Sequence, residues 1–384
     1  MDCKYIAFWR PKKTYYAFFS KKVILNLLNY LKKGYFCVMK QFAELLLEWY
    51  SHSGRHLPWR ESRDPYRIWV SEIILQQTQV SQGMDYYLRF VERFPDVASL
   101  AAATLDEVMK YWQGLGYYSR ARHLHEAAQS MKGHFPQRYD EVRALSGVGD
   151  YTAAAICSFA YDMPYAVVDG NVYRVLTRFF GISEPIDSAA GKRRVAQLAQ
   201  ELLSKERPAD FNQAMMDFGA LQCTPRQPLC ASCPLVGGCV AHEQQNVEGY
   251  PVKRHKTKVS DRYLHYIYVR AGAYTFINRR EADDIWKNLY ELPLVESTEP
   301  LDVEQLLKSK GFRAYFAANE VPEVRLLQQG VKHQLSHRTL HASFFEVVLP
   351  PDTRSFASCL RIPISQVGQY AVPRLIQAFF EKYL

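Results

Sequence analysis

The chain has 384 residues, of which 48% are hydrophobic, and holds 19 glycines and 19 prolines, a composition that excludes a disordered or fibrous protein and allows two cores. The formal net charge of +9 would favour a nucleic-acid partner, but residues 1–38 hold eight Lys or Arg against one Asp and so carry +7 of it. Residues 39–384 carry only the remaining +2, so the net charge does not identify the partner.

Residues 1–38 form a basic N-terminal extension ahead of Met39. Its apolar run at residues 23–31 is broken by two asparagines and is shorter than the ~20 residues that span a bilayer. No small-residue cleavage site follows the run, so a signal peptide is not expected. We interpret the extension as either a disordered arm or a misassigned start, and we expect no membrane segment.

A helical domain is predicted over residues 39–245. Asp64 followed by Pro65 is typical of a helix start, and the helix that follows carries Glu72 at its middle with Gln76 one turn further along the same face. Further helical periods lie at 84–93, 105–112, 120–131, 151–160, 172–179, 190–204 and 211–221. No strongly alternating stretch intervenes, which predicts an all-α domain.

A change of period marks a second domain. Residues 246–262 are basic and poorly periodic, as expected of a linker. Beyond them, residues 263–270 and 343–348 alternate as strands do, and helical patterns lie near 303–310 and 372–384. We therefore predict a smaller α/β domain over residues 263–384.

Four cysteines fall within 17 residues, in the pattern CysX6CysX2CysX5Cys at 223–239. Such a group indicates a metal site in a reducing compartment rather than a disulfide framework. Structural zinc sites usually pair two short CysX2-4Cys units, and only Cys230 and Cys233 form one here. The compact run favours a [4Fe-4S] cluster over zinc, and four buried structural thiols are the remaining alternative.

Two short motifs place polar groups at predicted helix starts. LeuSerGlyValGly at 145–149 lies between two helices, where glycines permit a tight turn and backbone N–H groups face a phosphate, as in a helix-hairpin-helix element; a plain connector is the alternative. Asp169 precedes another helix, and the positive end of that helix should keep its carboxylate ionised, although such an Asp is often only an N-cap.

Glu72 and Asp169 together indicate a chemistry. Glu72 is flanked by apolar residues, so we expect burial to raise its pKa, whereas the helix start should lower the pKa of Asp169. One acid and one anion are what glycosidic cleavage through an oxocarbenium-like state requires. The alternative for Glu72 is an ordinary acid on a helix surface.

The motifs, taken together and in order, resemble the adenine DNA glycosylase (MutY) family of the helix-hairpin-helix superfamily. The resemblance covers nearly all of residues 39–245. The motifs are ProTrpArg at 58–60, SerGluIleIleLeuGlnGlnThrGln at 71–79, GlyLeuGlyTyrTyrSerArg at 114–120, the glycine hairpin, ValAspGlyAsn at 168–171 and the four cysteines.

The resemblance implies an all-α glycosylase domain with a [4Fe-4S] cluster on Cys223, Cys230, Cys233 and Cys239. It implies removal of adenine mispaired with 8-oxoguanine or guanine in double-stranded DNA, by a monomer in the cytoplasm, at the nucleoid in a bacterium. By similarity, Glu72 protonates adenine at N7, Asp169 stabilises the positive sugar, and Tyr151 and Asn171 support the two carboxylates.

The resemblance also implies DNA contacts. Family members flip the adenine out of the duplex, and by similarity Gln76 fills the gap that it leaves. The hairpin glycines Gly147 and Gly149 would contact phosphate. The positions that match the adenine pocket are Arg55, Trp59 and Gln213, and those that match the 8-oxoguanine strand contacts are Gln77, Thr78, Leu115 and Tyr117. For Trp59 and Tyr117, ordinary core packing is the alternative.

Position 151 separates branches of the superfamily. Endonuclease III-like relatives carry a lysine directly after the hairpin, and its amine forms a Schiff base that leads to strand cleavage. Here Asp150 is followed by Tyr151. The resemblance therefore implies a monofunctional glycosylase that leaves an abasic site.

Residues 263–384 resemble the Nudix-like domain with which the family inspects 8-oxoguanine. The nucleotide-hydrolase signature is absent, so independent nucleotide hydrolysis is not expected. LeuSerHis at 335–337 aligns with a PheSerHis element, which makes Ser336 and His337 candidate lesion contacts. Leu335 departs from that element and removes its stacking ring, and His337 alone could equally be a solvated loop histidine.

Two rival interpretations remain at this stage. A thymine-specific or lesion-specific glycosylase of the same superfamily is disfavoured by Tyr151 together with Glu72. A catalytically idle DNA-scanning protein is disfavoured by the presence of both Glu72 and Asp169.

Overall fold

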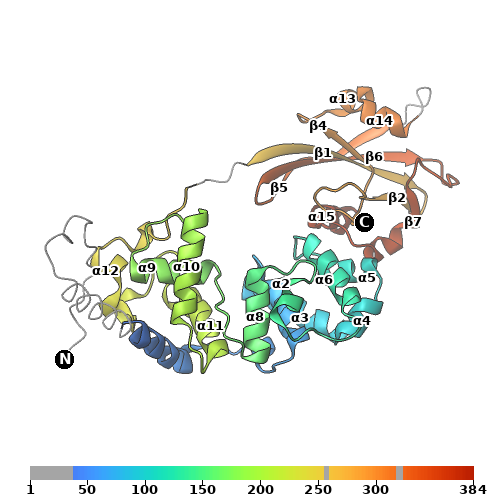
Figure 1. The fold of residues 1–384 in the computed structure, drawn as a ribbon. Helices are drawn as coiled ribbons and strands as arrows, with labels where there is room; N and C mark the ends of the chain where they lie inside the picture. Colours follow the sequence, from blue (N-terminus) through green and yellow to red (C-terminus); the bar gives the residue numbers. More distant parts are fainter. Residues whose placement is uncertain (1–37, 255–258, 317–322) are drawn as a thin grey trace, which may run out of the picture. The chain divides into compact units, whose positions relative to one another are not determined.

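The computed structural model describes residues 38–254, 259–316 and 323–384, which fall into two compact units (Figure 1). The first combines the described residues up to Glu72 with residues 136–254. The second combines residues 73–135 with the described residues from 259 onward. Residues 1–37 of the expected extension lie outside the described part of the chain.

The first unit is helical and packs around one apolar core. Its elements are helical residues 38–53, the first part of α2 (Pro65–Leu75), α7 (Tyr139–Arg143), α8 (Asp150–Tyr161), α9 (Gly170–Phe180), α10 (Ala189–Leu202) and α11 (Pro208–Asp217), which continues as a π-helical turn Phe218–Gln222. Phe42, Leu176, Leu198 and Phe211 are buried in its core. The predicted helices are confirmed, whereas the short helices α7 and α12 (Val240–Glu243) were missed.

The described part of the second unit contains a sheet, four helices that precede it in the chain and three helices from the same C-terminal region as the strands. The four preceding helices are α3 (Val80–Arg93), α4 (Val97–Ala102), α5 (Leu105–Trp112) and α6 (Ser119–Ser130). The sheet has seven strands, β1 (Ser260–Ala271), β2 (Tyr274–Arg279), β3 (Tyr290–Glu291), β4 (Leu294–Ser297), β5 (Val324–Gln334), β6 (Arg338–Leu349) and β7 (Leu360–Pro363). The three C-terminal helices are α13 (Val303–Lys308), α14 (Lys310–Tyr315) and α15 (Arg374–Tyr383).

The centre of the sheet is a parallel pair. Strand β1 runs parallel to β6 in unbroken register from Ser260 opposite Arg338 to Ala271 opposite Leu349, and every other pairing is antiparallel. The two predicted strands lie within this pair. An α/β domain after an all-α region is therefore confirmed, while β2, β3, β4, β5 and β7 were missed.

The unit boundary differs from the expected domain boundary at 245. Residues 73–135 belong with the sheet because polar contacts join them: Asp106 accepts hydrogen bonds from Arg279 (3.0 Å) and Tyr290 (3.1 Å), and Arg122 donates to the Lys287 carbonyl (3.0 Å).

The expected linker, residues 246–262, is also only partly extended chain. Tyr250 is 9% exposed, the Val252 carbonyl accepts a hydrogen bond from the Ile186 amide (3.0 Å), and β1 already begins at Ser260. Its early residues therefore belong to the first unit. No helix in the described part of the chain has the length and apolar character needed to cross a bilayer.

Candidate active site

Glu72 is a buried acid near the end of α2. The Asp64 carboxylate accepts a hydrogen bond from the Tyr66 amide (2.9 Å) at the predicted helix start, and the helix then carries Glu72 inward, to 5% exposure. Burial raises the pKa of Glu72 to about 7, against a hydrogen bond from the Tyr151 hydroxyl (2.8 Å) and the charge of Arg60, which lower it. The predicted rise is confirmed, and the surface-acid alternative is wrong.

Asp169 caps α9 and is richly hydrogen-bonded. Its carboxylate accepts from the Val172 amide (2.8 Å) and from Asn171 Nδ2 (2.7 Å). Burial nevertheless raises the pKa of Asp169, because the desolvation of the carboxylate outweighs these bonds. The prediction of a lowered pKa was therefore wrong: it counted the helix start and left out burial.

The two carboxylates still differ in the donors around them. Asp169 has two hydrogen-bond donors and the nearby charge of Arg174, whereas the one hydrogen bond described for Glu72 comes from Tyr151. The charge of Asp169 also raises the pKa of Glu72. An anion at Asp169 and a proton on Glu72 are the mutually compatible charge states.

The hairpin positions Tyr151 at the start of α8. Gly147 has φ +75°, a conformation that favours glycine, and the Val148 amide closes the turn on the Leu145 carbonyl (3.1 Å). Gly149 then caps α8, and Tyr151 follows in its first turn. Burial raises the pKa of Tyr151 well above its usual value, so the phenol stays protonated and donates to Glu72.

Arg174 is a site residue that the sequence reasoning missed. It donates to Asn171 Oδ1 (2.8 Å), to the Gly219 carbonyl (2.6 Å) and to the Cys223 carbonyl (2.8 Å). Since Asn171 in turn donates to Asp169, Arg174 ties the catalytic candidate to the cysteine segment. Its place on the same helix, three residues after Asn171, was the available signal.

A second missed group surrounds the predicted adenine pocket. The buried Asp217 accepts hydrogen bonds from Arg55 Nε (2.9 Å) and from Arg60 (2.8 and 2.9 Å). Gln213 Oε1 accepts from the Tyr50 hydroxyl (2.7 Å). Arg55 and Gln213 thus have intramolecular partners, and Trp59 is 5% exposed, as the core-packing alternative predicts.

The residues predicted to contact the 8-oxoguanine strand of the DNA lie in the second unit. The exposed Tyr117 donates from its hydroxyl to Gln77 Oε1 (2.5 Å) and lies 2.5 Å from Ser336 Oγ, so residues far apart in sequence meet. Gln77 and Tyr117 both have positive φ, at 58° and 46°. The core-packing alternative for Tyr117 is wrong, because this residue is 44% exposed.

The other residues predicted to contact DNA differ in their exposure to solvent. Leu115 is 7% exposed, and its contact with the 8-oxoguanine strand stays a prediction. His337 is exposed, and Thr78 and Gln76 are partly buried. The buried Arg120, which was also missed, donates to the Ile73, Ile74 and Gln76 carbonyls and so fixes the end of α2.

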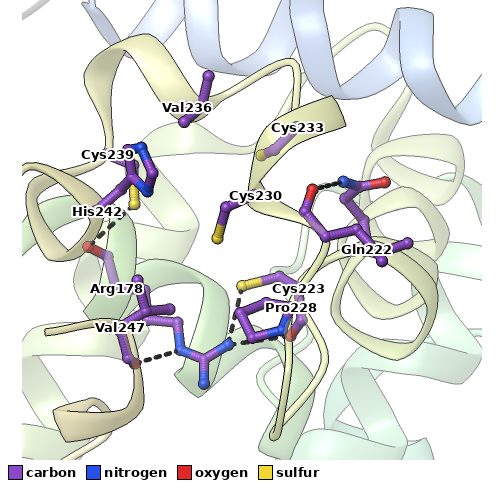
Figure 2. Close-up of a pocket in the computed structure, with 11 residues that line it drawn as sticks. Arg178, Gln222, Cys223, Pro228, Cys230, Cys233, Val236, Cys239, His242 and Val247 are labelled. Carbon is purple, nitrogen blue, oxygen red and sulfur yellow. Dashed lines mark hydrogen bonds between the residues drawn. The ribbon is translucent and has the colours of Figure 1, made fainter. Parts of the chain in front are cut away.

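The four cysteines line one cavity. Figure 2 shows the four sulfur atoms around this cavity, which is also lined by Arg178, Pro228 and His242. Within the described residues, no three His, Cys, Asp or Glu side chains converge on a position for a single metal ion. Arg178 borders the cavity and is 2% exposed; its Nη1 lies 3.4 Å from Cys223 Sγ.

Comparisons with known proteins agree with this geometry. The sequence model of the HhH-GPD superfamily of base excision DNA repair proteins matches residues 70–205, and a NUDIX domain model matches residues 265–382. The adenine DNA glycosylase of Buchnera aphidicola subsp. Schizaphis graminum is 33% identical over 305 residues, covering 78% of this chain and 85% of that protein.

The chain belongs to the adenine DNA glycosylase family. The adenine DNA glycosylase of Homo sapiens is 43% identical over 220 residues, 54% of this chain and 40% of that protein. A solved thermostable thymine-DNA glycosylase matches with a TM-score of 0.51 and 31% identity, covering 54% of this chain and 97% of that one. Membership in the adenine DNA glycosylase family makes the chain a base excision repair enzyme that hydrolyses N-glycosidic bonds, and the idle scanning interpretation is wrong.

Proposed function

We propose that the enzyme removes adenine mispaired with 8-oxoguanine or guanine from duplex DNA. The observation that carries the proposal is Glu72, a buried carboxyl group whose pKa of about 7 keeps about half of the molecules protonated at neutral pH. The names of the relatives supply the base, adenine. The cluster of Gln77, Tyr117 and Ser336 offers polar groups for the base opposite.

The chemistry divides between the two carboxyl groups. Glu72 donates its proton to N7 of the flipped adenine, which makes the base a neutral leaving group, and Tyr151 orients the acid. Breaking the bond from C1′ to the base leaves positive charge on the sugar, which the Asp169 carboxylate stabilises. Water then adds to C1′ and loses a proton, and an abasic site remains.

The enzyme is monofunctional in this proposal. A lyase needs an amine that bonds covalently to the sugar, and the position after the hairpin holds the phenol of Tyr151, which is committed to Glu72. We further propose that the enzyme acts as a monomer in the cytoplasm, at the nucleoid in a bacterium, where duplex DNA is found.

A single-turnover assay tests the proposal. A duplex with 8-oxoguanine opposite adenine is incubated with the purified full chain, and strand breaks are measured with and without alkali. We expect breaks only after alkali treatment. Breaks without alkali would show a lyase, and excision of thymine in place of adenine would contradict the substrate.

The four cysteines fit a [4Fe-4S] cluster. Their thiols line one pocket, and in the described residues they do not converge on a position for a single ion, which suits a cluster of several iron atoms better than zinc. Such a cluster, when bound, supplies folding energy to the cysteine loop. Arg178 donates to the Thr224 (2.7 Å), Pro225 (3.0 Å) and Val247 (2.9 Å) carbonyls and forms no ion pair with a described carboxylate, so its charge would face the anionic cluster.

Replacing Arg178 with methionine should weaken retention of the cluster. The substitution removes a buried cation and leaves carbonyl groups without donors, so we expect iron loss to a chelator to be faster by about tenfold or more. Visible absorbance and iron content measure this loss. Arg178→Lys should restore part of the retention, and exposed Arg193→Met should have no effect. Wild-type retention in Arg178→Met would contradict the role.

A further inference from the structure

A network of charged side chains lies at the base of the turn that carries Ser336 and His337. Asp284 belongs to the loop between β2 and β3 and accepts hydrogen bonds from Arg262 (2.6 Å), Arg338 (2.8 Å) and Arg280 (3.4 Å). Arg262 is held further by Glu296, at 2.6 and 2.8 Å. One carboxylate thus gathers three guanidinium groups.

The loop of Asp284 contacts both strands that support the turn. Strand β5 ends at Gln334 and β6 begins at Arg338, so the turn between them has only three residues. Arg338 contacts Asp284 on the β6 side, and the Trp286 ring lies 5.9 Å from the His333 ring on the β5 side. The loop therefore fixes both ends of the turn.

The same loop also contacts α6, which follows Tyr117, another residue predicted to contact the 8-oxoguanine strand of the DNA. Arg122 of α6 donates to the Lys287 carbonyl (3.0 Å), and Tyr117, just ahead of α6, lies 2.5 Å from Ser336 Oγ. Strand β5 has two register irregularities, between Leu326 and Val331, which leave it less constrained along its own length. The position of Ser336 against Tyr117 depends on contacts from outside the hairpin.

The guanidinium groups also have other partners that keep the loop folded. Arg280 donates to Glu291 (2.7 and 2.8 Å) and to the Ile285 carbonyl (3.1 Å), and the Asn288 amide bonds to the Arg280 carbonyl (2.8 Å). Removing the charge of Asp284 therefore leaves the loop closed while it weakens the contact to Arg338. Loss of the Asp284 charge should therefore change the position of the turn at residues 335–337 and leave the fold of the unit intact.

We propose that Asp284 is a positioning residue for specificity, which holds the turn that presents Ser336 and His337 to the base opposite the target adenine. The inference rests on the proposed function. Glu72 and Asp169 lie in the other unit, so the loss of Asp284 affects discrimination between 8-oxoguanine:A and G:A more than it affects excision itself.

The test compares single-turnover excision of adenine from 8-oxoguanine:A and from G:A by the full-length parent and Asp284→Asn. We expect the ratio of the two rates to fall by about fivefold, as for one weakened charge-assisted hydrogen bond, with the G:A rate unchanged. Asp283→Asn is the matched control, since Asp283 is 92% exposed and pairs only with Lys287 among the ion pairs described. That control should keep the parent ratio.

A second variant makes the outcome decisive. Arg338→Gln should lower the ratio as Asp284→Asn does, and the double variant should lower it no further, because both act through one contact. An unchanged ratio in Asp284→Asn, or an equal loss on both substrates, overturns the inference and leaves the proposed function standing. If the parent enzyme excises adenine at equal rates from 8-oxoguanine:A and G:A, it has no preference for the lesion, and the inference about Asp284 is then also wrong.

Discussion

Replacing Glu72 with glutamine is expected to reduce adenine excision by about 10²- to 10⁴-fold, the range that general acid catalysis contributes. Glutamine keeps the shape of the side chain and accepts the hydrogen bond from Tyr151, but its amide has no acidic proton to transfer to adenine N7. Single-turnover kinetics on an 8-oxoguanine:A duplex measure the loss. Unchanged duplex affinity is the control, and near-parental excision would remove Glu72 from the chemistry.

The raised pKa of Glu72 also predicts two pH effects. Glu72 must be protonated to act, so excision should fall as pH rises through about 7. Because the pKa is raised from 4.5 on folding, the stabilisation of the protonated form is complete below about pH 4.5 and is lost as pH rises through about 7. Above pH 7 the glutamine variant should therefore be the more stable protein, by at most on the order of 3 kcal/mol. Denaturant unfolding at pH 5 and pH 8 measures this difference.

Replacing Asp169 with asparagine is expected to lower excision by about 10²- to 10³-fold, the cost of losing one electrostatic group at a developing charge. Asparagine caps helices as well as aspartate does, so its oxygen can keep the bond to the Val172 amide. The amide nitrogen of the new asparagine would face Asn171 Nδ2. Because two donors then oppose each other, we expect the free energy of unfolding to fall by about 1 kcal/mol.

A matched substitution separates catalysis from capping. Asp302 caps α13 in the same way, accepting a hydrogen bond from the Gln305 amide (2.8 Å), and Asp302→Asn should leave excision unchanged. If Asp169→Asn excises adenine at the parental rate, Asp169 is an N-cap and no more. Thermal unfolding of both variants gives the stability comparison.

The sequence predicted what depends on local pattern. Burial of Glu72 followed from its apolar neighbours on a periodic helix, and the helices of the first unit followed from their spacing. The pKa of Asp169 did not, because the desolvation of a carboxylate depends on atoms from the rest of the unit. Asp217 was missed for a similar reason: its two arginine partners lie more than 150 residues away in the chain.

The second unit was harder to predict. Its central strands β1 and β6 alternate strongly, whereas β3 and β4 have only two and four residues and β5 is mostly exposed. The contact between Tyr117 and Ser336 spans 219 residues, and no local pattern encodes it. The Asp284 network likewise draws Arg262 from β1 and Arg338 from β6, and only Arg280 comes from its own loop.

The parallel pairing of β1 with β6 has a consequence for synthesis on the ribosome. Strand β1 pairs with residues 338–349, so the centre of the sheet cannot close until nearly the whole chain has been made. The helices at 73–135 share the second unit with that sheet and cannot complete their packing before it forms, whereas all described residues of the first unit have been made by residue 254. A nonsense codon between residues 272 and 338 would leave β1 without its partner β6, and we expect the truncated product to aggregate through that unpaired edge.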